Sequence, residues 1–393
     1  MTIAKKIESA INRSSWIRKM FEEGIRRKRL FGDDNVFDFS LGNPIIEPPN
    51  EFKRILKKLA NDKGKGMHAY MPNAGYERTR KAVADYLSDH NQGRLSSSDI
   101  VMTVGAGGAL NIILKTILDP DDEVIITSPY FVEYNFYIEN HQGIPVVAET
   151  RPDFSLDPNA IEKVFTGKTK AVLINSPNNP TGRVYSEGEL RELARLLDER
   201  GQRLGRQVYL ISDEPYRKIV YDDIEVPCIF NLYRDSFMAT SFSKDLSLPG
   251  ERIGYAAVNP DISEKPLIID GMILANRILG YVNAPALMQR AITELLDASV
   301  DVSLYQRKRD MLCSGLASLG YEYIKPQGAF YLFPKSPIED DAEFVSALQE
   351  ENILTVPGSG FGCPGHFRIA YCVNDSVIEG SMKGFKKAIK KYI

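Results

Sequence analysis

The chain has 393 residues, of which 43% are hydrophobic, and its formal net charge is −3. This length predicts two domains, or one large domain with a smaller one appended. The nearly neutral, slightly acidic balance argues against a nucleic-acid partner, and the lack of any run of about 18 apolar residues argues against a membrane span.

The first half of the chain predicts an α/β fold. A helix is expected near residues 14–30, and a short strand over Phe37–Leu41 is ended by the turn Gly42-Asn43-Pro44. Farther on, apolar runs alternate with helical stretches, and we predict buried strands over Ile100–Val104, Val124–Thr127, Ile144–Val147, Ala171–Ile174 and Val208–Ile211. Buried strands that alternate with helices indicate a largely parallel sheet, and the loops at its strand ends are the usual place for a site.

The pattern changes beyond about residue 285. One long helical stretch is predicted over 286–318, and a further helix near 341–351. A strand over Phe367–Tyr371 follows, and apolar residues from Ile378 to Ile389 recur at helical spacing. This final amphipathic helix is expected to cover a small sheet.

Cysteines and histidines give no sign of a metal site. The cysteines Cys228, Cys313, Cys363 and Cys372 are scattered, and no two histidines stand at ligand spacing. We therefore expect reduced structural thiols and no bound metal. Because the first residues lead into polar sequence and not into an apolar signal core, a cytoplasmic location is expected.

The stretch Ser241-Phe242-Ser243-Lys244, with Arg252 eight positions later, carries the strongest chemical signal. A desolvated lysine has a lowered pKa, so its free amine can form a Schiff base with an aldehyde. Hydroxyl groups and a guanidinium group can hold a phosphate. The stretch is therefore suited to pyridoxal 5′-phosphate (PLP), an aldehyde that carries a phosphate. The alternative is a chance match, because a single S-x-S-K motif is common.

Two stretches near strand ends could contribute to the same site. Val104–Ala109 follows a strand and opens a helix, whose N-terminal amides can bind phosphate, although glycine turns are common. Phe131 could stack on a ring, with core packing as the alternative.

Three further stretches supply polar groups. Asn179 lies in the turn that follows the strand ending at Ile174. Asp213 could pair with a pyridine nitrogen or cap a helix, and Tyr216 could bind the phenolic oxygen of the ring. Arg368, within an apolar strand, could bind a carboxylate of a substrate or form a structural salt bridge.

Together, and in this order along essentially the whole chain, these motifs resemble those of the class I/II aminotransferases of the fold-type I, aspartate aminotransferase superfamily. The resemblance implies a PLP-dependent transferase fold: a large domain with a mainly parallel sheet flanked by helices, plus a smaller α+β domain. We expect the large domain over residues 46–288 and the small domain from residues 1–45 and 289–393. The resemblance also implies that the protein is a homodimer.

The resemblance further implies a role for each motif residue. Lys244 is expected to be the Schiff-base lysine, with Asp213 at the ring nitrogen, Asn179 and Tyr216 at the ring oxygen, and Phe131 stacked on the ring. The phosphate would be surrounded by Ala106, Gly107, Gly108, Ser241, Ser243 and Arg252, and by Tyr70 of the neighbouring subunit. The carboxylate of the substrate would be bound by Gly42, Asn179 and Arg368.

The sequence departs from the family pattern in two places. Ala106-Gly107-Gly108 lacks the hydroxyl that relatives often carry, so backbone amides must do more of the phosphate binding. Phe131 replaces the tryptophan of some relatives. No second arginine can be placed for a side-chain carboxylate, so the sequence does not predict a preference for aspartate.

The expected reaction is ping-pong transamination between an L-amino acid and a 2-oxo acid, with Lys244 as covalent anchor and general acid–base and with Asp213 and Tyr216 as its catalytic partners. A carbon–sulfur (β) lyase on the same fold is the close alternative. A ligand-sensing regulator is an alternative from another class. It would need a DNA-binding domain, for which the residues before Gly42 leave little room.

Overall fold

The computed structural model describes residues 2–12, 16–90 and 93–392. A seven-stranded sheet forms its centre, with the strand order β2-β8-β7-β6-β5-β3-β4. The strands are β2 Ile100–Thr103, β3 Glu123–Ser128, β4 Ile144–Glu149, β5 Thr169–Asn175, β6 Tyr209–Asp213, β7 Ser236–Ser241 and β8 Gly254–Val258. β8 runs antiparallel to both of its neighbours and the other pairs are parallel, which confirms the predicted largely parallel sheet. β7 and β8 were not among the predicted strands.

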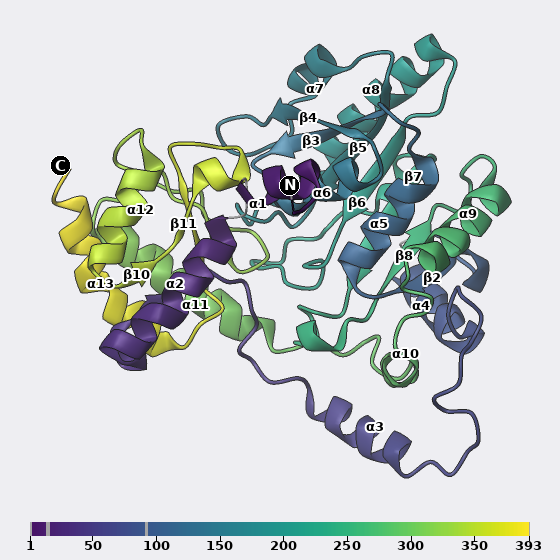
Figure 1. Cartoon of the computed structure of the whole chain (residues 1–393), viewed down its shortest axis with the longest axis horizontal. Helices are drawn as coiled ribbons and strands as arrows, with labels where there is room; N and C mark the ends of the chain where they lie inside the picture. Colours follow the sequence, from purple (N-terminus) through teal and green to yellow (C-terminus); the bar gives the residue numbers. More distant parts are fainter. Residues whose placement is uncertain (1, 13–15, 91–92, 393) are drawn as a thin grey trace.

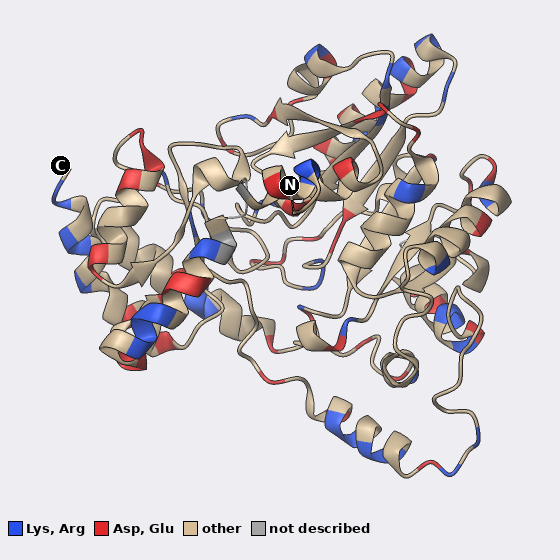
Figure 2. Cartoon of the chain, in the orientation of Figure 1, with Lys and Arg blue, Asp and Glu red and all other residues tan. Residues whose placement is uncertain are grey.

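Helices cover both faces of this sheet because successive strand residues point to opposite sides. Val124 and Ile126 belong to one hydrophobic core, and Ile125 between them belongs to another. The first core is closed by α5 Ala106–Ile117, α6 Glu133–Asn140 and α9 Lys265–Ile278. The second is closed by α3 Asn50–Ala60, α4 Glu77–Asp89, α7 Pro158–Val164, α8 Glu187–Leu204 and α10 Ala286–Ile292. α5, with Lys115 as its one charged residue, is almost entirely tan in Figure 2.

A third hydrophobic core joins the two ends of the chain. β1 Phe37–Asp38 pairs in parallel with β10 Ile353–Leu354, and β11 Val356–Pro357, β12 Phe367–Ala370 and β9 Tyr331–Leu332 form an antiparallel sheet. The surrounding helices are α2 Trp16–Phe31, α11 Val302–Ser318, α12 Asp341–Glu350 and α13 Asp375–Ile389. Figure 1 shows this group of helices on the left, beside the large sheet. The division at residues 46 and 288 stays a proposal, which these separate cores support.

The remaining elements are short. α1 spans Lys5–Asn12, and 3₁₀ turns occupy Asp33–Asn35, Ser97–Asp99, Ile229–Asn231, Pro249–Glu251 and Gly358–Phe361. The strand predicted over Phe37–Leu41 is only Phe37–Asp38 long, and residues 14 and 15 of the first predicted helix lie outside the described residues. None of the helices in the described part of the chain has the length and apolar character to cross a membrane.

The prediction of one continuous helical stretch over 286–318 is wrong. The chain leaves the helix after Ile292 and enters α11 at Val302. The intervening backbone bonds to other segments: Lys218 donates to the carbonyls of Leu296 and Ala298, and the amide of Val300 donates to Asp245 O at 2.7 Å. Asp301 then caps α11. Tertiary contacts and a capping residue therefore override the local helical pattern.

Candidate active site

A cavity of about 290 Å³ lies where the carboxyl ends of β5, β6 and β7 meet β12 and the N-terminus of α5. Segments far apart in sequence converge here, as expected for an α/β sheet. The predicted site residues that line it are Gly42, Ala106, Gly107, Phe131, Asn179, Asp213, Tyr216, Ser241, Ser243, Lys244, Arg252 and Arg368.

Lys244 is half-buried and faces the middle of this group. Its Nζ donates to Gly42 O at 2.8 Å and lies 5.9 Å from the ring of Tyr216 and 5.6 Å from that of Phe330. Burial lowers the pKa of Lys244 to about 8, with Arg368 and Arg252 acting in the same direction and the buried thiol of Cys372 opposing them. At pH 7 roughly a tenth of the amine is therefore unprotonated, far more than for a lysine of ordinary pKa, and this is the form that attacks an aldehyde.

Asp213 ends β6 and is buried with one oxygen unsatisfied. Its Oδ2 accepts a hydrogen bond of 2.5 Å from Tyr134 Oη, whereas its Oδ1 finds no partner among the described residues. Burial raises the pKa of Asp213 to about 7, against the opposing effect of the Tyr134 bond. Because an unsatisfied buried oxygen is costly, Asp213 is suited to a ligand that brings a donor or a positive charge.

Arg368 lies on β12 without an acidic partner in the described structure. It donates from Nη1 to Asn179 Oδ1 at 3.1 Å and from Nη2 to Ser40 O at 2.5 Å, and its Nε has no partner there. Its guanidinium is 4.8 Å from the ring centres of both Tyr331 and Phe361, and burial lowers the pKa of Arg368. The structural salt bridge considered for Arg368 is therefore not present among the described residues, and a buried guanidinium without a counter-ion favours an anionic ligand.

Tyr216 and Tyr331 connect the lysine to the arginine. Their hydroxyl oxygens are 2.7 Å apart, and burial keeps the pKa of Tyr216 well above its ordinary value. Gly42 fits against this pair because a Cβ at that position would lie 2.0 Å from Tyr331 Oη. A larger residue at position 42 would displace Tyr331 from Arg368.

The N-terminus of α5 forms a second place for an anion. Ala106 and Gly107 line the cavity there together with Ser241, Ser243 and Arg252, and the first amides of a helix attract negative charge. Arg252 donates from Nη1 to Pro249 O at 2.9 Å and from Nη2 to Val104 O at 3.2 Å. These two bonds hold its guanidinium beside the helix end.

Two predicted residues lie outside the cavity. Gly108 is turned into the protein, where a Cβ would lie 2.8 Å from Cγ2 of Val104. Tyr70 is 91% exposed and does not line the cavity of its own chain.

Several lining residues were missed by the sequence reasoning: Leu41, Leu110, Tyr134, Tyr137, Asn175, Pro215, Pro249 and Tyr331. Tyr134 and Tyr137 lie on α6 and follow Phe131, just before this helix, at intervals of three, so their helical spacing was a usable signal. Tyr331 stands in an apolar run, where nothing local separates a site tyrosine from a core tyrosine.

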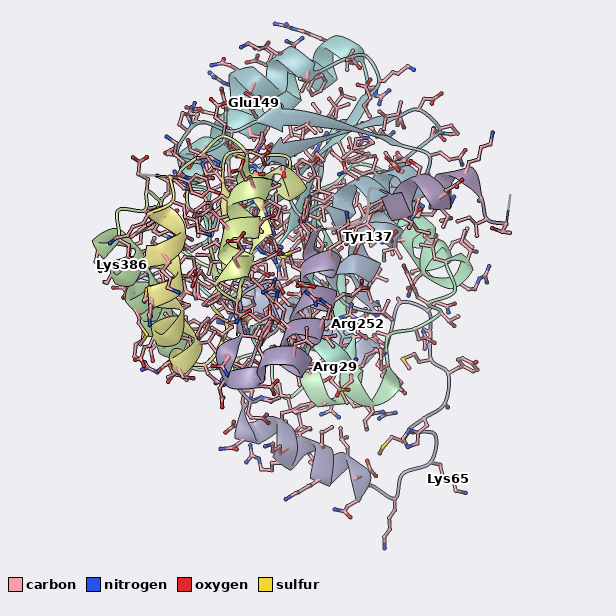
Figure 3. The ribbon with its side chains drawn as sticks, turned by 60° about the vertical axis from the view of Figure 1, so that its left-hand side comes forward. Arg29, Lys65, Tyr137, Glu149, Arg252 and Lys386 are labelled. Carbon is pink, nitrogen blue, oxygen red and sulfur yellow. The ribbon has the colours of Figure 1, made fainter. Side chains whose placement is uncertain are left out.

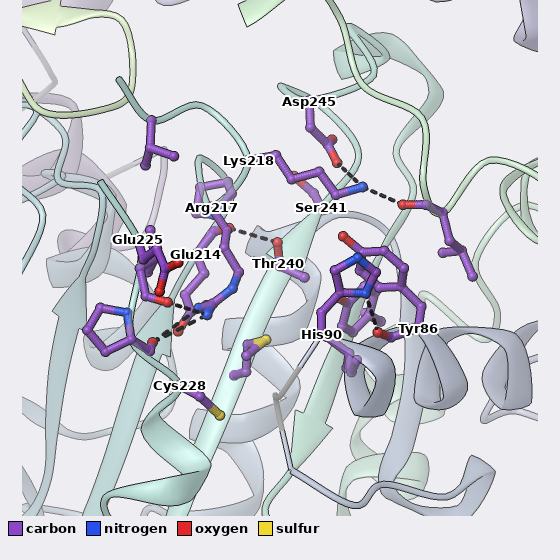
Figure 4. A pocket seen from close by; sticks show the side chains of 18 of the residues that line it. Tyr86, His90, Glu214, Arg217, Lys218, Glu225, Cys228, Thr240, Ser241 and Asp245 are labelled. Atoms are coloured by element: carbon purple, nitrogen blue, oxygen red, sulfur yellow. Dashed lines mark hydrogen bonds and ion pairs between the residues drawn. The ribbon is translucent and has the colours of Figure 1, made fainter. Parts of the chain in front are cut away.

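A larger cavity, of about 610 Å³, lies outside this cluster. Figure 4 shows that its charged side chains pair with one another: Arg217 contacts Glu214 at 2.5 Å, and Lys218 contacts Asp245 at 3.7 Å. Ser241 lines both cavities, but the unsatisfied groups of Asp213 and Arg368 belong to the smaller one. The smaller cavity is therefore the better candidate for chemistry. In the part of the chain that the structure describes, no group of His, Cys, Asp or Glu side chains could hold a metal ion.

Comparison with known proteins supplies the family. Residues 34–383 match the family described as aminotransferase class I and II. The chain is 32% identical to a probable aspartate/prephenate aminotransferase of Aquifex aeolicus, over 91% of this chain and 92% of that protein. It superimposes on an amino transferase from Eubacterium rectale with a TM-score of 0.97, 38% identity and coverage of 100% and 99% of the two chains. It also superimposes on the aspartate aminotransferase from Thermus thermophilus with maleate, with a TM-score of 0.88, 28% identity and coverage of 99% of this chain and 100% of that one. The chain therefore belongs to the class I and II aminotransferase family and is an aminotransferase.

Proposed function

We propose that the cavity binds PLP and that Lys244 is its covalent anchor in ping-pong transfer of an amino group between an L-amino acid and a 2-oxo acid. One observation carries the proposal: a desolvated lysine with a lowered pKa shares a small cavity with an unsatisfied carboxylate oxygen and an arginine that lacks a counter-ion. Each of these three groups lowers the stability of the protein without a ligand, and each can interact favourably with PLP or with an amino acid.

The residues present fit the cofactor at both of its ends. Asp213 Oδ1 is available for a protonated ring nitrogen, and the N-terminus of α5 with Ser241, Ser243 and Arg252 is available for the phosphate. When bound, PLP supplies an aldehyde carbon for the amino group and a conjugated ring that accepts electrons. Phe131 is proposed to stack on the ring, and Asn179 and Tyr216 to bind its phenolic oxygen.

The chain's own residues then orient the substrate and move its proton. Arg368, with Asn179 and Gly42, is proposed to hold the α-carboxylate through two parallel N–H···O contacts. With the cofactor in place, Lys244 Nζ would take the proton from the substrate Cα. Its lowered pKa suits this role because a base near neutrality is unprotonated when needed and still returns the proton.

The relatives favour this reaction over the alternatives. They are named as aminotransferases and not as carbon–sulfur lyases, and the family match covers nearly the whole chain. We also propose a homodimer in the cytoplasm. The four cysteines all lie among the described residues and none forms a disulfide, which supports a reducing compartment.

The relatives' names mention aspartate, but the described lining favours another amino donor. Its cations are Lys244, Arg252 and Arg368, and all three have proposed roles in binding the cofactor or the α-carboxylate. No further cation from these residues is available for a second carboxylate. From the lining that one chain supplies, we therefore propose a donor whose side chain is uncharged.

Trapping the covalent attachment tests the proposal directly. Purified protein loaded with PLP should absorb visible light, and borohydride should fix the cofactor on Lys244, as peptide mapping would show. Lys244→Ala should lose the label and transamination, whereas Lys218→Ala, whose amine lies against the larger cavity, should keep the label. Finding the label on a different lysine would overturn the assignment.

A further inference from the structure

The phosphate end of the cavity lacks a hydroxyl at the helix N-terminus. Ala106 and Gly107 offer only backbone amides there, and Gly108 is turned away into the protein. A phosphate dianion has several oxygens to satisfy, and charge-assisted hydrogen bonds from side chains are the strongest way to do so. A donor from another element would have to complete the phosphate site in this space.

Tyr137 on α6 reaches this space. It lines the cavity, and a Cβ built on Gly107 would lie 3.1 Å from Tyr137 Oη. The hydroxyl thus stands next to the position that a side chain at residue 107 would occupy, and the missing side chain of Gly107 leaves room for it. Among the described residues, the hydroxyl of Tyr137 makes no hydrogen bond, although most of its ring is covered.

The charges around Tyr137 suit a donor to an anion. Burial raises the pKa of Tyr137 well above its ordinary value, and Glu133 and Asp213 raise it further, so the hydroxyl keeps its proton. Arg252 acts on the same hydroxyl in the opposite direction, which indicates that the two groups share a common surrounding. Figure 3 labels both residues on the same side of the molecule.

We propose that Tyr137 Oη donates a hydrogen bond to the phosphate of the cofactor, in the place of a hydroxyl side chain on α5. The inference rests on the proposed function, because it needs PLP in this cavity. It assigns phosphate binding to a residue of α6 and explains why Gly107 carries no side chain: any Cβ there would crowd the tyrosine hydroxyl.

The test compares PLP with pyridoxal, which has the same ring and aldehyde but no phosphate. Cofactor-free wild type and Tyr137→Phe are titrated with each compound, and binding is followed by absorbance. Loss of one hydrogen bond to a charged group should weaken PLP binding by roughly 10- to 100-fold, and pyridoxal binding should not change. Tyr130→Phe is the matched control, because its hydroxyl accepts from Asn135 and lies outside the cavity; it should bind both compounds as the wild type does.

A second measurement isolates the anion. Inorganic phosphate should raise the melting temperature of the cofactor-free wild type and of Tyr130→Phe, and it should do so less for Tyr137→Phe at equal concentration. Equal PLP affinity in Tyr137→Phe and wild type would overturn the assignment, and so would an equal loss for PLP and pyridoxal, which would place the contact at the ring. If the wild type itself does not bind PLP at Lys244, the proposed function fails instead.

Discussion

At the scale of single residues, the cavity is marked by groups that the protein does not satisfy by itself. Asp213 keeps one bare buried oxygen, Arg368 has a guanidinium nitrogen without a partner, and Lys244 is a cation with its charge penalised by burial. Natural proteins pair nearly all buried polar groups. Two unpaired polar groups and one desolvated amine in one small cavity are better explained by a bound ligand than by the demands of folding.

Asp213 should make the cofactor-free protein less stable as the pH rises. The pKa of Asp213 is about 7 in the folded state, against an ordinary value of 3.8. Between these two pH values the folded state therefore binds the proton more tightly than the unfolded state does. Stability is therefore lost as the pH rises from about 4 to 7, by an amount on the order of 4 kcal/mol. Asp213→Asn should remove this loss, so the cofactor-free variant should unfold at higher urea than wild type at pH 8 and at similar urea near pH 4.

The same substitution should damage catalysis. An amide cannot keep the ring nitrogen protonated, so turnover should fall by about 100-fold or more, equivalent to about 3 kcal/mol of transition-state stabilisation. Wild-type turnover combined with an unchanged pH dependence of unfolding would rule out both statements about Asp213.

Arg368→Lys should weaken every substrate, because all share the α-carboxylate. A lysine keeps the charge but loses the planar fork of donors. The value of kcat/KM should therefore fall roughly 30- to 150-fold, which corresponds to a loss of about 2–3 kcal/mol of transition-state stabilisation. PLP affinity should barely change. Steady-state kinetics with one uncharged and one acidic donor, beside a melting curve, check this. A lower melting temperature with normal kcat/KM would mean that Arg368 is only structural, and a wild-type preference for the acidic donor would contradict the proposed donor class.

At the scale of elements, the N-terminus of α5 depends on one glycine conformation. Gly105 has φ of 84° and ψ of 179°, a region that is nearly restricted to glycine. A Cβ there would also lie 2.8 Å from Arg252 Nη2. The glycine thus allows the turn from β2 into α5 and also the close approach of the arginine.

Gly105→Ala should therefore cost stability and cofactor affinity together. Backbone strain should lower stability by about 1–3 kcal/mol, and the displaced guanidinium should weaken PLP more than pyridoxal. Gly205→Ala is a suitable control. Gly205 also has a positive φ, of 61°, but nothing lies within 4 Å of its added Cβ. This control should lose some stability and keep full PLP affinity. An equal loss of PLP affinity in both variants would contradict the role of the close contact between Gly105 and Arg252.

Elements also show what the sequence could and could not reveal. The carboxyl ends of β5 and β6 were predictable, because apolar runs stop abruptly at Asn175 and Asp213. β7 and β8 were not predicted, since Ser236–Ser241 mixes polar and apolar residues and Gly254–Val258 is rich in small residues. Tyr331 escaped notice because its pairing with Tyr216 is a contact between residues 115 positions apart.

At the scale of the whole molecule, one surface is built around an exposed tyrosine. Tyr70 precedes a loop that is fixed to the end of α9: Asn73 donates to Val282 O, Asn276 donates to Asn73 O, and Asn283 donates to Pro72 O, each at 3.0 Å. Leu274 and Ile278 of α9 are exposed apolar side chains on the helix that carries Asn276. Figure 3 shows the chain after α3, around Lys65, extending away from the body. A projecting loop and exposed apolar residues favour a protein partner.

The proposed partner is a second copy, whose phosphate site Tyr70 would reach. Mixing a chain with weakened PLP binding and an inactive chain tests this. Tyr70→Phe should bind PLP more weakly through loss of one hydrogen bond to the phosphate, by roughly 10-fold, and Lys244→Ala should be inactive. In a mixed dimer, the chain with Tyr70→Phe keeps its own Lys244 and receives Tyr70 from its partner, so one site is fully restored. At limiting PLP, the refolded mixture should therefore exceed the summed activity of the separate variants. A monomer in sedimentation, or activity equal to that sum, would exclude a shared site.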